Sequence, residues 1–372
     1  MNLRPSGYEP DELPTAPPRY KGLYIYKYRK KIKLCQGRPY FSKLNSSMRF
    51  VTLYLFLLFA FSHAYFGKEN EAQAVFGWAT LLHSPRTVSF EGAGSALPSQ
   101  DFGAALMNPA LLQGDGYGAG LSWQSGDFAD NQGIAVFSHE FFTGRMQHTY
   151  GVVDNGEVQH YDDRGQEENM VSRPMAQYYA ITVAFPLKNL KFGITGRYLW
   201  ERLAETYESQ IGMGLAMDWG FLWNPGSARY GFAFMGRHLG SQFRAYTKGG
   251  VNGFALASEL AASTFWRPNP NLTWLFECSA PRYSPAIGKL GFEYRFADPV
   301  HIRVGMQREL IDVGRFARSL FDNDENAPKA GFYRLFSAGA GYKPGNFAID
   351  YSYSMLIEGM GSEHRVALSG NF

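Results

Sequence analysis

Few residues of this chain have the types and spacing that catalysis requires. His139-Glu140 begins the His-Glu-x-x-His pattern of zinc hydrolases, but Thr143 stands where the second histidine should be. The eight histidines are scattered and form no pair at metal-binding spacing. The sequence also lacks the Gly-x-Ser-x-Gly motif of serine hydrolases and the glycine-rich loop of nucleotide-binding proteins. We therefore expect neither an enzyme nor a cofactor.

Acidic residues gather in two polar segments. Residues 322–326 resemble the start of a calcium-binding EF-hand loop, but Ala327 replaces the required glycine and Tyr333 the bidentate glutamate. We interpret this segment as a solvated acidic loop and predict no metal site. The acidic pairs at 162–163 and 167–168 could bind a partner's basic patch or divalent ions shared with lipopolysaccharide, whereas simple loop solubility is the alternative. The candidate partner contacts are Asp162, Asp163, Glu167, Glu168, Asp322 and Asp324.

The elements that would carry these segments are strands. From Phe347 to Met355 every odd position is large and apolar or aromatic, and every even position is small or polar. This repeat of two places the two kinds of side chain on opposite faces of a strand, whereas a helix would mix them. Fourteen such runs follow one another: 117–124, 132–142, 144–153, 177–186, 191–204, 211–223, 229–238, 252–266, 271–279, 288–297, 300–308, 332–342, 346–355 and 364–372.

The composition indicates that these strands lie in a membrane. Aromatic residues make up 16% of the chain, which has 41 glycines, yet the mean hydropathy is only −0.27. This mixture is typical of transmembrane barrels, in which lipid-facing apolar positions alternate with polar positions facing the lumen. A soluble sandwich or propeller is the alternative. Because only a closed sheet pairs every backbone group inside a bilayer, we predict an all-β fold, a transmembrane antiparallel barrel of about 14 strands, over residues 117–372.

The last strand supports this prediction. Residues 364–372 are apolar on one face and polar on the other, and the run ends at Phe372. A closing strand with a terminal aromatic residue is typical of outer-membrane barrels, so we interpret Phe372 as the assembly terminus and expect the protein in the cell outer membrane. Short Pro-, Gly- and Asn-rich turns alternate with longer polar stretches, and in such barrels the long loops face outward. The loops 154–176, 239–251 and 309–331 are therefore the candidate sites for a surface partner.

Residues 65–116 do not follow the strand pattern. They contain the small-residue stretch Gly92-Ala93-Gly94 and the pair Asn108-Pro109. Asparagine is a favoured helix cap and proline is favoured at the first helical position, so Asn108 and Pro109 mark a helix start. We predict that 65–116 forms an N-terminal plug, containing a short helix, in the barrel lumen.

The N-terminal part of the chain has the features of a targeting sequence. The apolar run 51–61 is too short for the ~20 residues of a membrane-spanning helix. Arg49 precedes it and Ser62-His63-Ala64 follows, which predicts a signal peptide over 48–64. Residues 1–47 contain ten Lys or Arg and three Asp or Glu. We interpret them as an upstream extension absent from the mature protein, with a basic binding arm as the alternative.

The remaining chain excludes two other classes of protein. From residue 65 onward its net charge is −5, so there is no electrostatic reason for it to bind nucleic acid. Of the two cysteines, Cys35 lies in the segment expected to be absent, which leaves Cys278 without a disulfide partner.

The segment before the barrel also resembles a known family. The PorV/PorQ outer-membrane proteins begin with Phe-x-x-Leu, Ser-Ala-Arg, a glycine pair, an acidic residue and Asn-Pro-Ala in that order. The likeness covers about residues 75–372, and the segment 228–242 is more similar to the PorQ branch. The matching positions are Val75-Phe76-Gly77, Leu82-His83-Ser84-Pro85-Arg86, Glu91-Gly92-Ala93-Gly94, Asp101 and Asn108-Pro109-Ala110-Leu111-Leu112.

This resemblance implies a barrel like that of the long-chain fatty-acid transporter and a role in type IX secretion. PorQ-like members hold a surface partner in the complex that attaches secreted proteins to lipopolysaccharide. We therefore expect a scaffold that anchors such a secretion-system surface protein, with outer-membrane lipid and lipopolysaccharide around it. The alternative is a transporter of hydrophobic small molecules with a lipid-like ligand in the lumen. It predicts an apolar pocket against residues 75–112.

Overall fold

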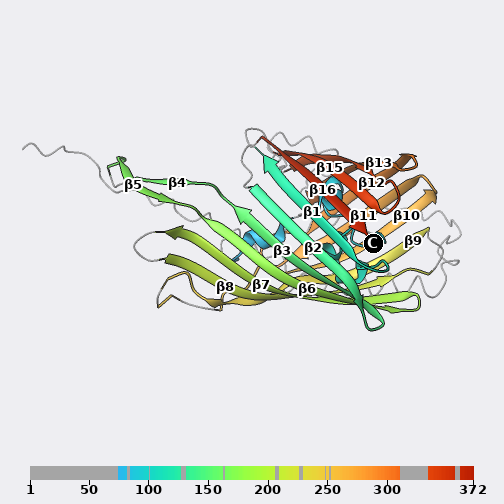
Figure 1. The fold of residues 1–372 in the computed structure, drawn as a ribbon, viewed down its shortest axis with the longest axis horizontal. Helices are drawn as coiled ribbons and strands as arrows, with labels where there is room; N and C mark the ends of the chain where they lie inside the picture. Colours follow the sequence, from blue (N-terminus) through green and yellow to red (C-terminus); the bar gives the residue numbers. More distant parts are fainter. Residues whose placement is uncertain are drawn as a thin grey trace, which may run out of the picture. The chain divides into compact units, whose positions relative to one another are not determined.

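The computed structural model describes residues 74–81, 84–99, 101–126, 131–161, 164–205, 209–225, 229–247, 249–250, 253–310, 334–356 and 361–372. In it, fourteen antiparallel strands form a closed barrel, in which each strand pairs with its neighbours in sequence and β1 pairs with β16 (Figure 1). The predicted fold class and strand number are confirmed. The predicted signal peptide and upstream extension lie outside the described residues.

The strands of the barrel are long and regular. Their bounds are β1 Gly118–Gly126, β2 Asn131–Phe141, β3 Gly144–Asp154, β6 Met175–Leu187, β7 Leu190–Glu205, β8 Ser209–Trp223, β9 Tyr230–Arg244, β10 Glu259–Asn269, β11 Leu272–Pro281, β12 Ile287–Ala297, β13 Val300–Glu309, β14 Arg334–Tyr342, β15 Phe347–Leu356 and β16 Ser362–Asn371. In the described part of the chain before β1 there are four short helices: η3 Gly77–Thr80, α2 Pro85–Ser89, α3 Ala104–Met107 and η4 Pro109–Leu111. Among the described residues, no helix is long and apolar enough to cross a membrane.

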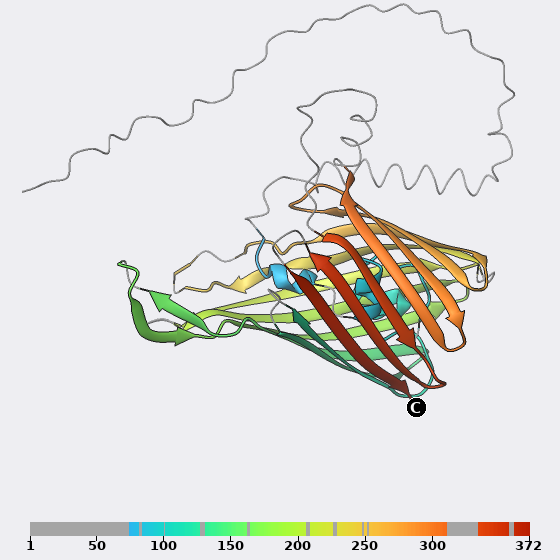
Figure 2. The same ribbon diagram turned by 90° about the horizontal axis from the view of Figure 1, so that it is seen from above.

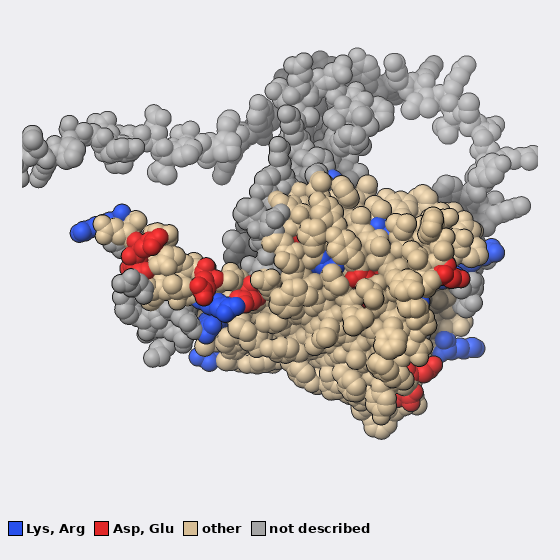
Figure 3. Space-filling view, turned by 45° about the horizontal axis from the view of Figure 1, so that its top comes forward, with Lys and Arg blue, Asp and Glu red and all other residues tan. Residues whose placement is uncertain are grey.

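The predicted alternation of faces is confirmed by the exposure of the side chains. On β15, Phe347, Ile349 and Tyr351 are 40–51% exposed, whereas Asp350 and Ser352 are at most 7% exposed. The outward side chains face lipid, and in the view of Figure 3 the barrel surface between its two ends has few charged side chains. This apolar belt on a closed barrel places the protein in the cell outer membrane.

The two ends of the barrel differ. At one end the strands are joined by short turns, such as the one between Leu187 and Leu190, and there the first strand begins and the last strand ends. At the other end lie the long connections, including 155–174 between β3 and β6. Because short turns face the periplasm in such barrels, we call these ends the inner and the outer end.

Two predicted loops contain more structure than expected. The loop 154–176 folds in part into a separate hairpin, β4 Val158–Tyr161 and β5 Glu167–Ser172, which projects from the outer end (Figures 1 and 2). The predicted loop 239–251 was also too long, because β9 continues to Arg244. Conversely, the predicted strand 252–266 begins only at Glu259. Residues 253–258 instead fold against β9, where Ala255 forms an isolated bridge to Ser241.

Main-chain hydrogen bonds at the C-terminus close the ring. The Phe372 N–H donates to the Tyr117 carbonyl oxygen at 2.7 Å, and the Tyr117 N–H donates to the Phe372 carbonyl oxygen at 3.0 Å. The Phe372 ring, 67% exposed, packs edge-on against Phe347 with 5.7 Å between ring centroids. The terminal residue therefore extends the seam between β1 and β16 and faces outward.

Deletion of Phe372 should lower the yield of folded barrel. It removes both of these hydrogen bonds, and an unpaired backbone group costs several kcal/mol in lipid, on the order of 4–8 in a medium that cannot hydrogen-bond. The heat-modifiable band of outer-membrane fractions on SDS gels measures the folded share. Phe372→Tyr, which keeps both hydrogen bonds and an aromatic ring, is the matched control. Equal folded shares for the deletion and for this control would contradict the prediction.

Candidate functional site

A segment that precedes the first strand lies inside the barrel (Figure 2). We call residues 84–99 and 101–112 the lumen segment; it includes α2, α3 and η4. Apolar side chains from the segment, among them Phe90, Leu97 and Leu111, pack with inward-facing Met235 and Phe265 of the strands. The barrel interior is therefore filled by protein at this level.

Asn108 and Pro109 lie at a helix start. Pro109 is the first residue of η4, and the Asn108 side-chain oxygen accepts a hydrogen bond from the Ala110 N–H at 3.0 Å. The Asn108 amide also donates to the Ser95 carbonyl oxygen at 2.9 Å. One fully buried side chain thus caps η4 and joins two parts of the lumen segment.

Two arginines of the barrel wall hold the end of α3. Arg197 of β7 donates to the Leu106 carbonyl oxygen at 3.1 Å, and Arg237 of β9 donates to the Met107 carbonyl oxygen at 2.6 Å. These carbonyls belong to the last turn of α3, where helical partners are missing. Arg237 also donates to the Ser95 hydroxyl at 2.6 Å. The wall therefore supplies the hydrogen bonds that this helix end needs.

Glycines in the wall let the lumen segment approach the strands closely. A Cβ atom added at Gly305 of β13 would collide with the backbone of Phe90, and one added at Gly193 of β7 would collide with the backbone of Pro109. By contrast, nothing lies within 4 Å of the corresponding position at Gly196, which faces outward. The lumen segment thus sits in recesses of the wall that any larger residue would fill.

An outer cavity of about 450 Å³ lies between the lumen segment and the outer end of the barrel. Charged side chains reach it, and most of them are paired: Arg197 with Asp218 at 2.8 Å, Lys289 with Glu277 at 2.9 Å, and Arg237 with both Glu277 and Glu259. The rest of its lining is largely apolar and includes Leu81, Leu106, Met107, Ala257, Pro281 and Ile287.

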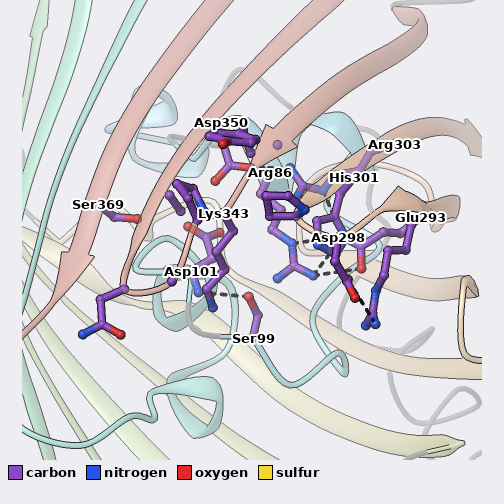
Figure 4. A pocket seen from close by; sticks show the side chains of 18 of the residues that line it. Arg86, Ser99, Asp101, Glu293, Asp298, His301, Arg303, Lys343, Asp350 and Ser369 are labelled. Atoms are coloured by element: carbon purple, nitrogen blue, oxygen red, sulfur yellow. Dashed lines mark hydrogen bonds and ion pairs between the residues drawn. The ribbon is translucent and has the colours of Figure 1, made fainter.

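An inner cavity of about 700 Å³ lies on the other side of the lumen segment and opens among the short turns (Figure 4). Its lining is more polar. Arg86 of the lumen segment binds Glu293 of β12 at 3.1 Å, and Arg303 of β13 binds the same carboxylate at 2.9 Å as well as Asp350. Asp101 accepts a hydrogen bond from the Ser84 hydroxyl at 2.7 Å. The cavity is thus a chamber of largely neutralised charge.

Two groups of the inner cavity lie outside the strands. Burial raises the pKa of the Asp101 carboxyl, and the Asp350 carboxylate raises it further. Burial lowers the pKa of the Lys343 ammonium group, and nearby Arg86 lowers it as well. Both shifts favour the uncharged form, so the cavity carries less charge than its residue types suggest.

A bulge in β9 lies beside the outer cavity. Met217 pairs with Leu239 and Trp219 pairs with Gly236, so Asp218 faces two residues of β9 instead of one. The second of these, His238, has a φ of 54°, which is in the left-handed region. Its N–H donates to the Asp218 carboxylate at 2.6 Å. The bulge is therefore held by a buried carboxylate that Arg197 neutralises.

The structure does not bring the predicted partner residues together with these cavities. Glu167 and Glu168 belong to β5 of the projecting hairpin, where the Tyr161 hydroxyl donates to the Glu167 carboxylate at 3.3 Å. Asp162, Asp163, Asp322 and Asp324 lie outside the described residues. Among the described residues, no group of three or more side chains is arranged to hold a metal ion.

The residues that line the two cavities were mostly missed by the sequence analysis. Their signal was present, because Arg197, Asp218 and Glu277 each occupy a polar position in an otherwise alternating strand. A charged residue in phase with the inward face of a membrane strand points into the lumen. The sequence could not show which of these charges pair, because the partners lie on different strands.

Comparisons with known proteins agree with this fold. No family model and no curated protein sequence matches the chain. Solved structures do match: the toluene transporter TodX of Pseudomonas putida is 12% identical, covers 83% of this chain and all of its own (100%), and gives a TM-score of 0.54. The toluene transporter TbuX of Ralstonia pickettii is 12% identical, with 79% and 99% covered and a TM-score of 0.54.

At this identity the likeness shows a common fold. The chain is built like outer-membrane hydrocarbon-transporter barrels, which agrees with the predicted likeness to a fatty-acid-transporter barrel. These neighbours give no support to the PorV/PorQ resemblance. The role in type IX secretion that this resemblance implies stays a prediction.

Proposed function

We propose that this barrel carries hydrophobic small molecules across the outer membrane. The observation that carries the proposal is the outer cavity, in which apolar side chains lie against the lumen segment and most of the charged groups are in ion pairs. Ligand sites of small molecules have this character, with a mostly apolar lining and a few placed polar groups. The cavity also matches the pocket against residues 75–112 that the transporter alternative predicts.

The filled lumen argues against a general pore for water-soluble solutes. Porins of that kind keep an open, water-filled channel, whereas here α2, α3 and η4 separate the outer cavity from the inner one. Transport would need a movement of the lumen segment that joins the two cavities. The polar contacts between segment and wall, made by Arg86 of the segment and by Arg197 and Arg237 of the wall, would then have to break.

The neighbours with the same fold are described as toluene transporters, which favours an apolar cargo over a sugar or an ion. No catalytic step is part of the proposal. The inner cavity would receive the cargo after passage, and its paired charges offer a polar surface from which an apolar molecule dissociates readily.

Filling the outer cavity should abolish the transport. Cells with an outer membrane that express this protein should take up radiolabelled toluene faster than cells with an empty vector. Ala257→Trp adds a large side chain to the cavity lining and should return uptake to the vector level. The matched control is Ala340→Trp, because Ala340 is exposed on the lipid face of β14. Equal uptake with and without the protein would refute the proposal.

A further inference from the structure

His238 combines two unusual features at the wall of the outer cavity. It is 6% exposed, lines the cavity, and its ring nitrogen Nδ1 has no hydrogen-bond partner. It is also a non-glycine residue with a φ of 54°. A buried polar atom without a partner and a left-handed backbone both cost free energy. A residue that combines the two at a cavity wall, as His238 does, needs a physical explanation.

The bulge explains how this side chain reaches the cavity. In a regular strand, adjacent residues point to opposite faces, so only one of Arg237 and His238 would face inward. The extra residue in β9 breaks this alternation, and both side chains are buried, at 2% and 6% exposure. Bulges beside binding sites often redirect a side chain in this way. Here the redirected side chain is an imidazole, and it lines the cavity next to Arg237.

The charges around the cavity favour a neutral ligand. Arg197, Arg237 and Lys289 are matched by Asp218, Glu259 and Glu277, and all of them are joined in ion pairs. Arg282 and Glu91, which also line the cavity, add one charge of each sign. An ionic ligand would meet no excess of opposite charge. His238 is therefore a polar group in this lining that can offer a hydrogen bond without breaking an ion pair.

We propose that His238 makes the hydrogen bond to a neutral ligand that has an apolar body and one hydroxyl or carbonyl group. This inference rests on the proposed function and names the class of cargo. A neutral imidazole has one donor and one acceptor nitrogen, so it can pair with either group. The volume of about 450 Å³ suits a compound of one or two rings.

Toluene and 4-methylphenol form a matched pair of probes, since they differ by one hydroxyl group. Equilibrium dialysis of the purified, folded barrel measures both affinities, after correction for partition into protein-free micelles. The wild type should bind 4-methylphenol about tenfold more tightly than toluene, since one hydrogen bond to a buried group is of that order.

Two variants separate the role of the ring from that of the backbone. His238→Gly removes the ring and suits the left-handed conformation, so the barrel should fold and the preference for 4-methylphenol should be lost. His238→Asn also tolerates this conformation but keeps a hydrogen-bonding side chain, and it should keep part of the preference. A merely structural histidine would leave the ratio of the two affinities unchanged in both variants.

Each outcome decides between the two proposals. A wild type without preference, or a His238→Gly variant that keeps it, would overturn the role of His238 while toluene binding still supports transport of hydrophobic molecules. If the wild type binds neither probe, both proposals fall. Where a variant does not fold, the wild-type ratio still tests the proposal, because a wild type without preference overturns it.

Discussion

Replacing Gly305 with valine should dislodge the lumen segment and raise the ion conductance of the barrel. The added side chain would collide with the backbone of Phe90, and the closed ring of hydrogen-bonded strands leaves the lumen segment as the part that yields. Overpacking of this kind costs about 1–3 kcal/mol. This corresponds to roughly a 5- to 150-fold shift in the equilibrium between the docked and the dislodged lumen segment. Conductance of the purified protein in planar lipid bilayers measures the change.

Gly196→Val is the matched control for this experiment. Gly196 faces lipid on β7, and nothing lies within 4 Å of the position where its Cβ would stand. It should therefore leave the conductance at the wild-type level. A second variant at the opposite wall, Gly193→Val, should act like Gly305→Val, because its side chain would meet the backbone of Pro109. A folded Gly305→Val barrel with unchanged conductance would show that the lumen segment does not close the channel.

Arg237→Met should lower the free energy of unfolding by about 3–5 kcal/mol, the usual cost of removing one partner from a buried ion pair. Arg237 is 2% exposed and contacts Glu259, Glu277, Ser95 and the Met107 carbonyl oxygen. Without it, Glu259 loses its ion-pair partner, Glu277 keeps only Lys289, and the end of α3 loses one hydrogen bond. Urea unfolding in lipid vesicles, followed by tryptophan fluorescence, measures the loss.

Two further variants test the cause of this loss. Combining Arg237→Met with Glu259→Gln and Glu277→Gln removes the unpaired charges and should restore part of the stability. Arg173→Met breaks an ion pair with Asp154 at the base of the projecting hairpin, where the arginine side chain is 57% exposed. Because exposed ion pairs are well solvated, this change should have little effect. A loss at Arg237 no larger than that at Arg173 would contradict the buried-pair explanation.

The barrel was predictable because apolar and polar side chains alternate along consecutive residues of each strand. Phe347, Ile349 and Tyr351 share one face whatever their neighbours are, so the period alone indicates a strand. The Asn108-Pro109 helix start was equally local, since it depends on the preference of two adjacent residues.

What escaped the sequence analysis depends on partners that are distant in sequence. The bulge at His238 exists because the Asp218 carboxylate of the neighbouring strand accepts a hydrogen bond from the His238 backbone N–H. No pattern in the residues around His238 predicts this hydrogen bond. The same holds for the pairs of Arg237 with Glu259 and Glu277, which define the outer cavity. The β4–β5 hairpin was missed for another reason: its strands are short and polar, so the alternation is too brief to stand out from a loop.

The position of the lumen segment has a consequence for biogenesis. This segment is synthesised before any strand, yet its contacts with Glu293, Gly305 and Gly339 come from the last quarter of the chain. Those docking surfaces do not exist until the late strands have paired, and the ring itself closes only when β16 pairs with β1. The lumen segment must therefore be kept soluble through export and dock only after these strands have formed. This dependence favours slow maturation and a need for periplasmic chaperones.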